Sequence, residues 1–337
     1  MKETVLEVKD LVTTFKSADC PLPAVRGASF SVKKGETLCI VGESGCGKSI
    51  TALSIMGLLP SNGMIADGSI SFNQKNLAEM SPKQMQKVRG NDVSMIFQEP
   101  MTALNPVFTI GFQIREPLMI HLKLSKKQAH MRGIELLKMV GIPSPVERMN
   151  QFPHELSGGM RQRVMIAIAL SCNPSLLIAD EPTTALDVTI QAQIIDLLND
   201  LKEQLDMSMI MITHDMGVVA EIADRVIVMY AGEIIEEGRV EEIFENPQHP
   251  YTKGLLASVP NVDDPEFDLK PIAGSMPMLN EQISGCRFHP RCPYAFDKCM
   301  EKSPKTFHVT DKQSVRCWLQ EEGVEQNGGR RASSISC

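Results

Sequence analysis

The sequence has no hydrophobic run long enough to cross a membrane. Its longest apolar stretches, such as residues 226–231, fall far short of the roughly 20 residues that a membrane-spanning helix needs. The first residues also lack a basic segment followed by an apolar stretch, so we expect no secretory signal and an intracellular chain. Any function at a membrane is therefore expected to depend on a partner.

An excess of basic charge is also missing. The 34 Lys and Arg residues face 41 Asp and Glu residues, which gives a net charge of −7, so we expect no nucleic-acid partner. Hydrophobic residues at 43% and charged residues at 22% argue against a disordered, collagen-like or coiled-coil chain. A length of 337 residues is instead typical of one large core with a smaller appendage.

Buried strands alternate with helical segments along most of the chain. The first 35 residues favour short antiparallel strands, and residues 37–41 form a continuous apolar run of the kind buried in a parallel sheet. Similar runs at 176–179, 209–213 and 225–230 are separated by segments of helical period. This pattern predicts an α/β fold.

A glycine-rich loop links the first buried run to an apolar helical segment. It fits the P-loop pattern G-x4-G-K-S, whose backbone N–H groups surround a phosphate. Lys48 is expected to reach the β- and γ-phosphates, and the Ser49 hydroxyl to ligate Mg²⁺. The residues expected to bind ATP in this loop are Gly42, Glu43, Ser44, Gly45, Cys46, Gly47, Lys48 and Ser49.

Two adjacent acids end the buried run at 176–179. Asp180 is placed to hold the metal, because α/β sheets present ligand groups at the carboxyl ends of their strands. Glu181 is a candidate to orient or deprotonate the attacking water. Two acids that merely follow a strand are the alternative, but it is disfavoured beside a P-loop.

A further motif indicates the class of P-loop protein. The string Leu-Ser-Gly-Gly-Met-Arg-Gln-Arg at 156–163 resembles the signature of ATP-binding cassette (ABC) ATPases. Gln98 resembles their Q-loop glutamine, Asp187 their D-loop aspartate and His214 their switch histidine. Phe15 lies where these proteins stack an aromatic ring on adenine, although a core phenylalanine is the alternative.

The resemblance implies a fold and a division of roles. The fold would be a RecA-like core with an antiparallel β subdomain and an inserted helical subdomain. Ser49, Gln98 and Asp180 would organise Mg²⁺, and Glu181, His214 and Gln98 would be the catalytic residues.

The signature implies a dimer. In this family Ser157, Gly158 and Gly159 would meet the γ-phosphate bound by a second subunit. One P-loop and one signature therefore supply half of each of two ATP sites.

The residue strings at 182–193 and 246–256 are similar to those of the dipeptide and oligopeptide importers, specifically their D-type subunit. This resemblance implies an F-type paralogue as the dimer partner, two membrane permeases, and an extracellular or periplasmic substrate-binding protein. The chain would lie at the cytoplasmic face of the membrane. An importer of nickel, another metal complex or glutathione is the alternative, and a soluble ABC ATPase of translation or DNA repair is a further one.

From about residue 245 the chain is rich in proline, which marks a boundary. We expect an ABC nucleotide-binding domain at 1–255 with its helical subdomain at about 100–170, a loop-rich module at 256–320, and a disordered tail at 321–337.

Four cysteines in this module are spaced C-x5-C-x6-C-x17-C. In a chain expected to be cytosolic, such a group favours a metal over disulfides, but the spacing does not name the metal. Zinc sites usually contain C-x2-4-C pairs, which are missing here, whereas the resemblance to the peptide importers implies a [4Fe-4S] cluster. Zinc and no metal remain the alternatives for Cys286, Cys292, Cys299 and Cys317.

Overall fold

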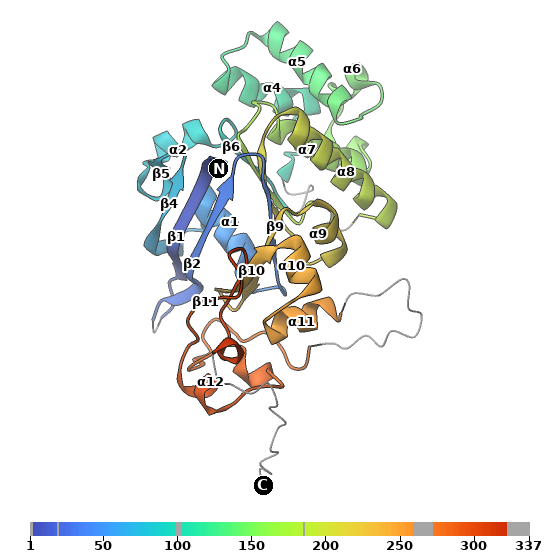
Figure 1. Cartoon of the computed structure of the whole chain (residues 1–337). Helices are drawn as coiled ribbons and strands as arrows, with labels where there is room; N and C mark the ends of the chain where they lie inside the picture. Colours follow the sequence, from blue (N-terminus) through green and yellow to red (C-terminus); the bar gives the residue numbers. More distant parts are fainter. Residues whose placement is uncertain (1–2, 19, 99–102, 185, 259–271, 322–337) are drawn as a thin grey trace.

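The structure is a computed structural model, and it describes residues 3–18, 20–98, 103–184, 186–258 and 272–321 (Figure 1). The expected disordered tail at 321–337 lies outside these residues except for Glu321.

Among the residues so described, the larger sheet has eight strands in the order β11-β12-β10-β9-β3-β8-β7-β6. The five strands from β9 to β6 are parallel to one another, and β10, β12 and β11 continue the sheet in antiparallel pairing. The α/β fold and its four expected buried strands are thus confirmed. The strands are β3 (Thr37–Val41), β6 (Val93–Ile96), β7 (Leu176–Asp180), β8 (Ser208–Ile212), β9 (Arg225–Tyr230), β10 (Glu233–Arg239), β11 (Phe307–His308) and β12 (Ser314–Val315).

A second, antiparallel sheet has the order β2-β1-β4-β5 and forms the layer in blue and cyan in Figure 1. It confirms the antiparallel strands expected at the start of the chain. Its strands are β1 (Thr4–Phe15), β2 (Leu22–Lys33), β4 (Gly63–Phe72) and β5 (Lys75–Asn76).

Helices cover the larger sheet on both faces, so alternate residues of each parallel strand enter different cores. Leu38 and Ile40 of β3 pack with α1 and the antiparallel sheet, whereas Cys39 and Val41 pack with α7, α8 and α9. Burial on both faces explains why these strands are apolar throughout. The helices are α1 (Lys48–Met56), α2 (Pro82–Val88), α4 (Ile110–His121), α5 (Lys126–Met139), α6 (Pro145–Arg148), α7 (Gly158–Ala169), α8 (Val188–Gln204), α9 (Met216–Ile222), α10 (Val240–Glu245), α11 (Pro250–Leu256) and α12 (Asp297–Glu301).

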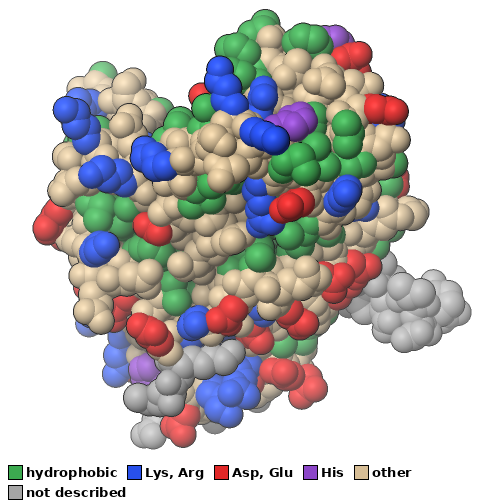
Figure 2. Space-filling view, turned by 90° about the horizontal axis from the view of Figure 1, so that it is seen from above, with side chains coloured by type: hydrophobic (Ala, Val, Ile, Leu, Met, Phe, Trp, Pro, Cys, Tyr) green, Lys and Arg blue, Asp and Glu red, His purple; other side chains and the backbone are tan. Residues whose placement is uncertain are grey.

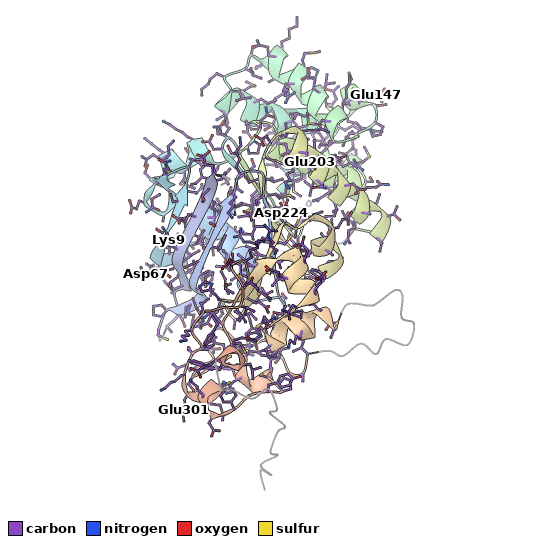
Figure 3. The ribbon with its side chains drawn as sticks, viewed as in Figure 1. Lys9, Asp67, Glu147, Glu203, Asp224 and Glu301 are labelled. Carbon is purple, nitrogen blue, oxygen red and sulfur yellow. The ribbon has the colours of Figure 1, made fainter. Side chains whose placement is uncertain are left out.

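Helices α4 to α7 fill the interval between β6 and β7, where the sequence predicts helices. Side-chain caps mark where two of these helices begin. The Thr109 hydroxyl caps α4, and Ser125 and Gln128 form a capping box at the start of α5. This helical layer and the C-terminal segment lie at opposite ends of the molecule, as the positions of Glu147 and Glu301 show (Figure 3).

The C-terminal segment is joined to the core through the sheet itself. Strand β12 pairs with β10, and the buried Glu236 carboxylate of β10 accepts hydrogen bonds from the backbone of Gln248 and His249 and from the Gln313 side chain, at 2.7, 2.9 and 3.0 Å. The described part of the module expected at 256–320 therefore contributes two strands to the larger sheet.

His249 is expected to make the fold sensitive to acid. Its imidazole is buried and accepts the Tyr251 N–H at 3.0 Å, and burial lowers its pKa from 6.5 to about 3. The unfolded chain binds a proton below pH 6.5 while the folded chain does not, so stability falls as the pH decreases from about 6.5 toward 3. Between pH 7 and pH 5 this loss should be about 2 kcal/mol.

Replacement of His249 by Asn tests this effect, because Asn retains a side-chain acceptor at the helix N-terminus but does not titrate. We expect urea unfolding at pH 7 and pH 5 to show a smaller loss of stability for His249→Asn than for the wild type. Equal losses would contradict the assignment.

Candidate functional site

The expected nucleotide-binding residues gather at one edge of the larger sheet. The P-loop follows β3, Gln98 follows β6, Glu181 follows β7 and His214 follows β8. Because these four strands are parallel, their carboxyl ends meet at the same edge. Residues far apart in the sequence therefore share one site.

Glycine is required at two positions of the P-loop. Gly42 has φ of 149°, and a Cβ there would lie 2.3 Å from the Met229 carbonyl oxygen. Gly47 has φ of 110°, and a Cβ there would lie 2.8 Å from the Ala24 carbonyl oxygen. Among the described residues, no side chain caps the first turn of α1, so its N–H groups are free to meet an anion.

Lys48 is held by the loop that precedes it. Its buried ammonium donates to the carbonyl oxygens of Gly42 and Glu43 at 2.7 and 3.1 Å. A bound phosphate can replace these two carbonyl oxygens as the acceptor for the Lys48 ammonium, because a charged acceptor forms a stronger hydrogen bond than a neutral one.

Ser49 and Asp180 form the candidate magnesium pair. The Ser49 hydroxyl donates to the Asp180 carboxylate at 3.0 Å. Burial raises the pKa of Asp180, and the hydrogen bond from Ser49 opposes this effect. Hard oxygen ligands of this kind suit Mg²⁺.

Glu181 is the centre of a polar cluster. Its carboxylate accepts hydrogen bonds from the Gln98 amide at 2.9 Å and from the Thr184 hydroxyl at 3.0 Å, and it lies 3.4 Å from Nδ1 of His214. Its backbone has φ of 47°, a conformation uncommon for residues other than glycine. The Glu181 N–H donates to the Ile212 carbonyl at 2.9 Å, which helps to fix this strained backbone.

A hollow of about 260 Å³ lies against the P-loop. Phe15 contributes to its wall, and the Phe15 ring packs beside Gly63, where a Cβ would come within 3.0 Å of the ring. Among the described residues, its lining does not include Gly42, Glu43 or Cys46. The residues predicted from the sequence that line it are Phe15, Ser44, Gly45, Gly47, Lys48, Ser49, Gln98 and Glu181.

Cys46 and Glu43 face away from this hollow. Cys46 is fully buried in the core next to α1, and burial raises the pKa of its thiol. The Glu43 carboxylate instead forms a two-pronged ion pair with the Arg291 guanidinium, at 2.7 and 3.0 Å. The Glu43 N–H donates to the Tyr251 hydroxyl at 2.8 Å.

Arg291 and Tyr251 are thus residues near the P-loop that the sequence analysis missed. No P-loop motif contains them, and Arg291 lies 248 residues beyond Glu43 in the chain.

The signature residues line a second hollow, of about 400 Å³, which shares no lining residue with the first within the described part of the chain. Ser157 caps α7, and Asp187 caps α8 by accepting the Ile190 N–H at 2.9 Å. Gly158 and Gly159 complete the expected set at this hollow. Among the described residues, the P-loop and the signature thus line two separate hollows.

The four cysteines of the C-terminal segment are close enough for their charges to interact, and their thiols are reduced. Burial raises the pKa of Cys286 to about 11 and that of Cys317 to about 12, and the charges of neighbouring cysteines add to both shifts. However, no group of three or more His, Cys, Asp or Glu side chains within the described ranges is arranged to hold a metal ion. In this arrangement the thiols do not fit a bound metal or cluster.

Within the described ranges, every helix is too short or too polar to cross a membrane. A helix that spans the bilayer needs about 20 predominantly apolar residues.

The sequence is similar to those of known transport proteins. The family profile "ABC transporter" matches residues 25–184, and the profile "Oligopeptide/dipeptide transporter, C-terminal region" matches residues 235–299. The sequence is 55% identical over 326 residues to the oligopeptide transport ATP-binding protein AppD of Bacillus subtilis (strain 168), covering 96% of this chain and 99% of that protein. It is 53% identical to the dipeptide transport ATP-binding protein DppD of the same strain, covering 96% and 97%.

The fold is similar to that of a solved ABC cassette. The ATP-binding cassette MJ0796, solved as a dimer in a post-hydrolysis state with ADP and Pi, matches with a TM-score of 0.63 and 29% identity over 70% of this chain and 98% of that one. The near full-length match to the Bacillus proteins and the C-terminal profile narrow the family further. This chain belongs to the ABC ATPases, within the group of ATP-binding subunits of oligopeptide and dipeptide transporters.

Proposed function

We propose that this chain binds and hydrolyses Mg-ATP to power the import of dipeptides or oligopeptides through a membrane permease. The observation that carries the proposal is the convergence of Lys48, the Ser49–Asp180 pair and the Glu181 cluster at one edge of the parallel sheet. The names of the Bacillus relatives support peptides as the cargo. Import of nickel, another metal complex or glutathione is the alternative.

Each polar group has a role in this proposal. Lys48 and the P-loop N–H groups bind the phosphates, while Ser49, Gln98 and Asp180 hold Mg²⁺ directly or through water. Glu181 acts as general base toward the attacking water, and His214, beside it, contacts the γ-phosphate. Phosphoryl transfer depends mainly on such positioning and on electrostatic stabilisation.

The active form in this proposal is a dimer. The hollow at Ser157, Gly158, Gly159 and Asp187 would close over the nucleotide bound by the partner's P-loop, and the separation of the two hollows on one chain supports this arrangement. We propose an F-type paralogue as the partner. ATP bound between the two cassettes would favour the closed pair, and its hydrolysis would release them.

The helical layer offers a surface for the permease. Phe108 and Phe112 stack with ring centroids 4.5 Å apart, and both are partly exposed. Other large apolar side chains of this layer are also exposed, and Figure 2 shows apolar and basic side chains side by side on the face seen from above. Exposed apolar patches mark sites of protein contact. These other exposed apolar side chains are Val107, Ile120, Leu122, Met131 and Val146.

Docking there would hold the chain at the cytoplasmic face of the membrane, with an extracellular or periplasmic binding protein that delivers the cargo.

The four C-terminal cysteines are proposed to bind a [4Fe-4S] cluster, with zinc as the alternative. Four thiols near one another support this proposal, and binding would require them to move from their present arrangement. Anaerobically purified protein is expected to contain about four irons and equivalent sulfide per chain. Cys299→Ser should lose them, whereas Cys172→Ser, a substitution in the other part of the chain, should not. One zinc per chain would favour the alternative, and neither metal would refute both.

Transport assays test the function as a whole. The chain, its paralogue and the two permeases would be reconstituted in liposomes with the binding protein, and ATP-dependent uptake of a labelled tripeptide and of nickel would be compared. Peptide uptake that stops without ATP is the expected result. Nickel uptake without peptide uptake would support the alternative, and ATP hydrolysis at full rate by the isolated monomer would contradict the dimer mechanism.

A further inference from the structure

A single arginine of the C-terminal segment bonds to two different parts of the chain. Two nitrogens of the buried Arg291 guanidinium chelate the carboxylate of Glu43 in the P-loop. The same guanidinium donates to the carbonyl oxygens of Ala273 and Ile272, at 2.8 and 3.4 Å. Arg291 therefore ties the first residues of the segment 272–281 to the loop that is proposed to bind phosphate.

Packing holds this segment in place beyond its first residues. Met276 is partly buried against both hydrophobic cores of the protein. The Met278 N–H donates to the Glu281 carboxylate at 3.3 Å. The segment is thus anchored by the hydrogen bonds from Arg291 to its Ala273 and Ile272 carbonyl oxygens and by the apolar contacts of Met276.

The end of the anchored segment reaches the nucleotide hollow. Leu279 lines it together with Phe15 and Ser44, and its side chain is 40% exposed. The neighbouring Met278 is 73% exposed, and among the described residues it is not part of the lining. An apolar side chain that faces a polar loop across an open hollow gains contacts when an apolar part of a ligand fills the space.

We propose that Leu279 contacts the base of the bound nucleotide and that Arg291 positions it, so that the C-terminal segment completes the ATP site. The inference rests on the proposed ATP binding. It concerns a nucleoside triphosphate, whose flat base offers apolar faces to Leu279 and Phe15 while its phosphates meet the P-loop. Arg291 supports both the residues that precede Leu279 and the P-loop, because it also bonds to the Glu43 carboxylate.

Comparison of two ligands separates contact with the base from contact with the phosphates. Isothermal titration calorimetry on the full chain would measure Mg-ATP and Mg-tripolyphosphate, which has no base. Leu279→Ala should lower the affinity for ATP about threefold to tenfold, because part of the buried apolar contact is lost. Its affinity for tripolyphosphate should be unchanged. The matched control, Met278→Ala, should bind both ligands as the wild type does.

Arg291→Lys tests the positioning role. A lysine keeps the positive charge but cannot chelate the carboxylate and reach two carbonyl groups with a planar fork. We expect Arg291→Lys to lower the affinity for ATP more than the affinity for tripolyphosphate. Loss of the support of the P-loop affects both ligands, whereas loss of the Leu279 contact affects only ATP. Arg316→Lys, also in the C-terminal part of the chain but paired with Glu233, is the control and should bind both ligands normally.

The outcomes distinguish the inference from the function on which it rests. A wild-type chain that binds neither ligand would refute the proposed ATP site itself. A wild-type chain that binds ATP, combined with a Leu279→Ala variant of unchanged affinity, would refute the contact alone. Parallel losses of ATP and tripolyphosphate in Leu279→Ala would also overturn it, since they would indicate a general distortion of the loop.

Discussion

Replacement of Glu181 by Gln is expected to lower steady-state ATP hydrolysis by about two to four orders of magnitude, the usual contribution of a positioned general base. The amide cannot accept a proton from the attacking water, yet it has nearly the same shape as the carboxylate. The ATP affinity should therefore be retained, and the unhydrolysed nucleotide should hold two cassettes together. Single-turnover hydrolysis and size-exclusion chromatography with ATP would measure both effects.

The surroundings of Glu181 sharpen this test. Gln98 and Thr184 both donate to the same carboxylate oxygen, Oε2, so the variant keeps both hydrogen bonds when its amide oxygen takes that position. Thermal unfolding would show whether the fold is retained. Glu203→Gln, at an exposed position near the end of α8 (Figure 3), is the matched control and should hydrolyse ATP normally. If Glu181→Gln hydrolysed ATP at the wild-type rate, Glu181 would not be the general base.

Replacement of Lys48 by Met is expected to weaken ATP binding on the order of 100-fold, which corresponds to about 3 kcal/mol. The ammonium donates to two carbonyl oxygens of the loop, and Lys48 lines the hollow beside the P-loop. Methionine fills a similar volume but provides no charge or donor. Titration with a fluorescent ATP analogue, with and without Mg²⁺, would measure the loss.

The fold of the Lys48→Met variant should survive, because an apolar side chain suits a buried position better than a charge whose acceptors are neutral carbonyl oxygens. Lys87→Met, at an exposed position in the last turn of α2, is the control and should bind ATP as the wild type does. An unchanged affinity in Lys48→Met would show that the loop does not bind phosphate.

The sequence predicts the parts of the fold that have strong local patterns. Strands such as β3 and β8 are buried on both faces, so their residues are apolar without interruption. Strand β12 has only two residues, Ser314 and Val315, and therefore has no periodicity to detect. Its pairing with β10 depends on contacts between residues about 80 positions apart, which no local pattern reports.

The candidate site divides in the same way. Lys48, Ser49 and Asp180 could be predicted because phosphate and Mg²⁺ chemistry restricts the residue types and their spacing. Leu279 and Arg291 could not, because a leucine or an arginine in a proline-rich segment has many possible roles. Cys46 and Glu43 belong to the P-loop motif, yet their side chains turn away from the hollow. A motif thus fixes the path of the backbone more reliably than the direction of each side chain.

The pairing of β12 with β10 has a consequence for shortened forms of this protein. A chain cut after α11 would keep the P-loop, the signature and every parallel strand. It would, however, leave the β12-facing edge of β10 open to water or to a strand of another molecule, including the Ile235 carbonyl that accepts the Arg316 N–H at 2.8 Å. The last part of the polypeptide therefore shields the sheet from unwanted self-association, in addition to any role it has near the nucleotide.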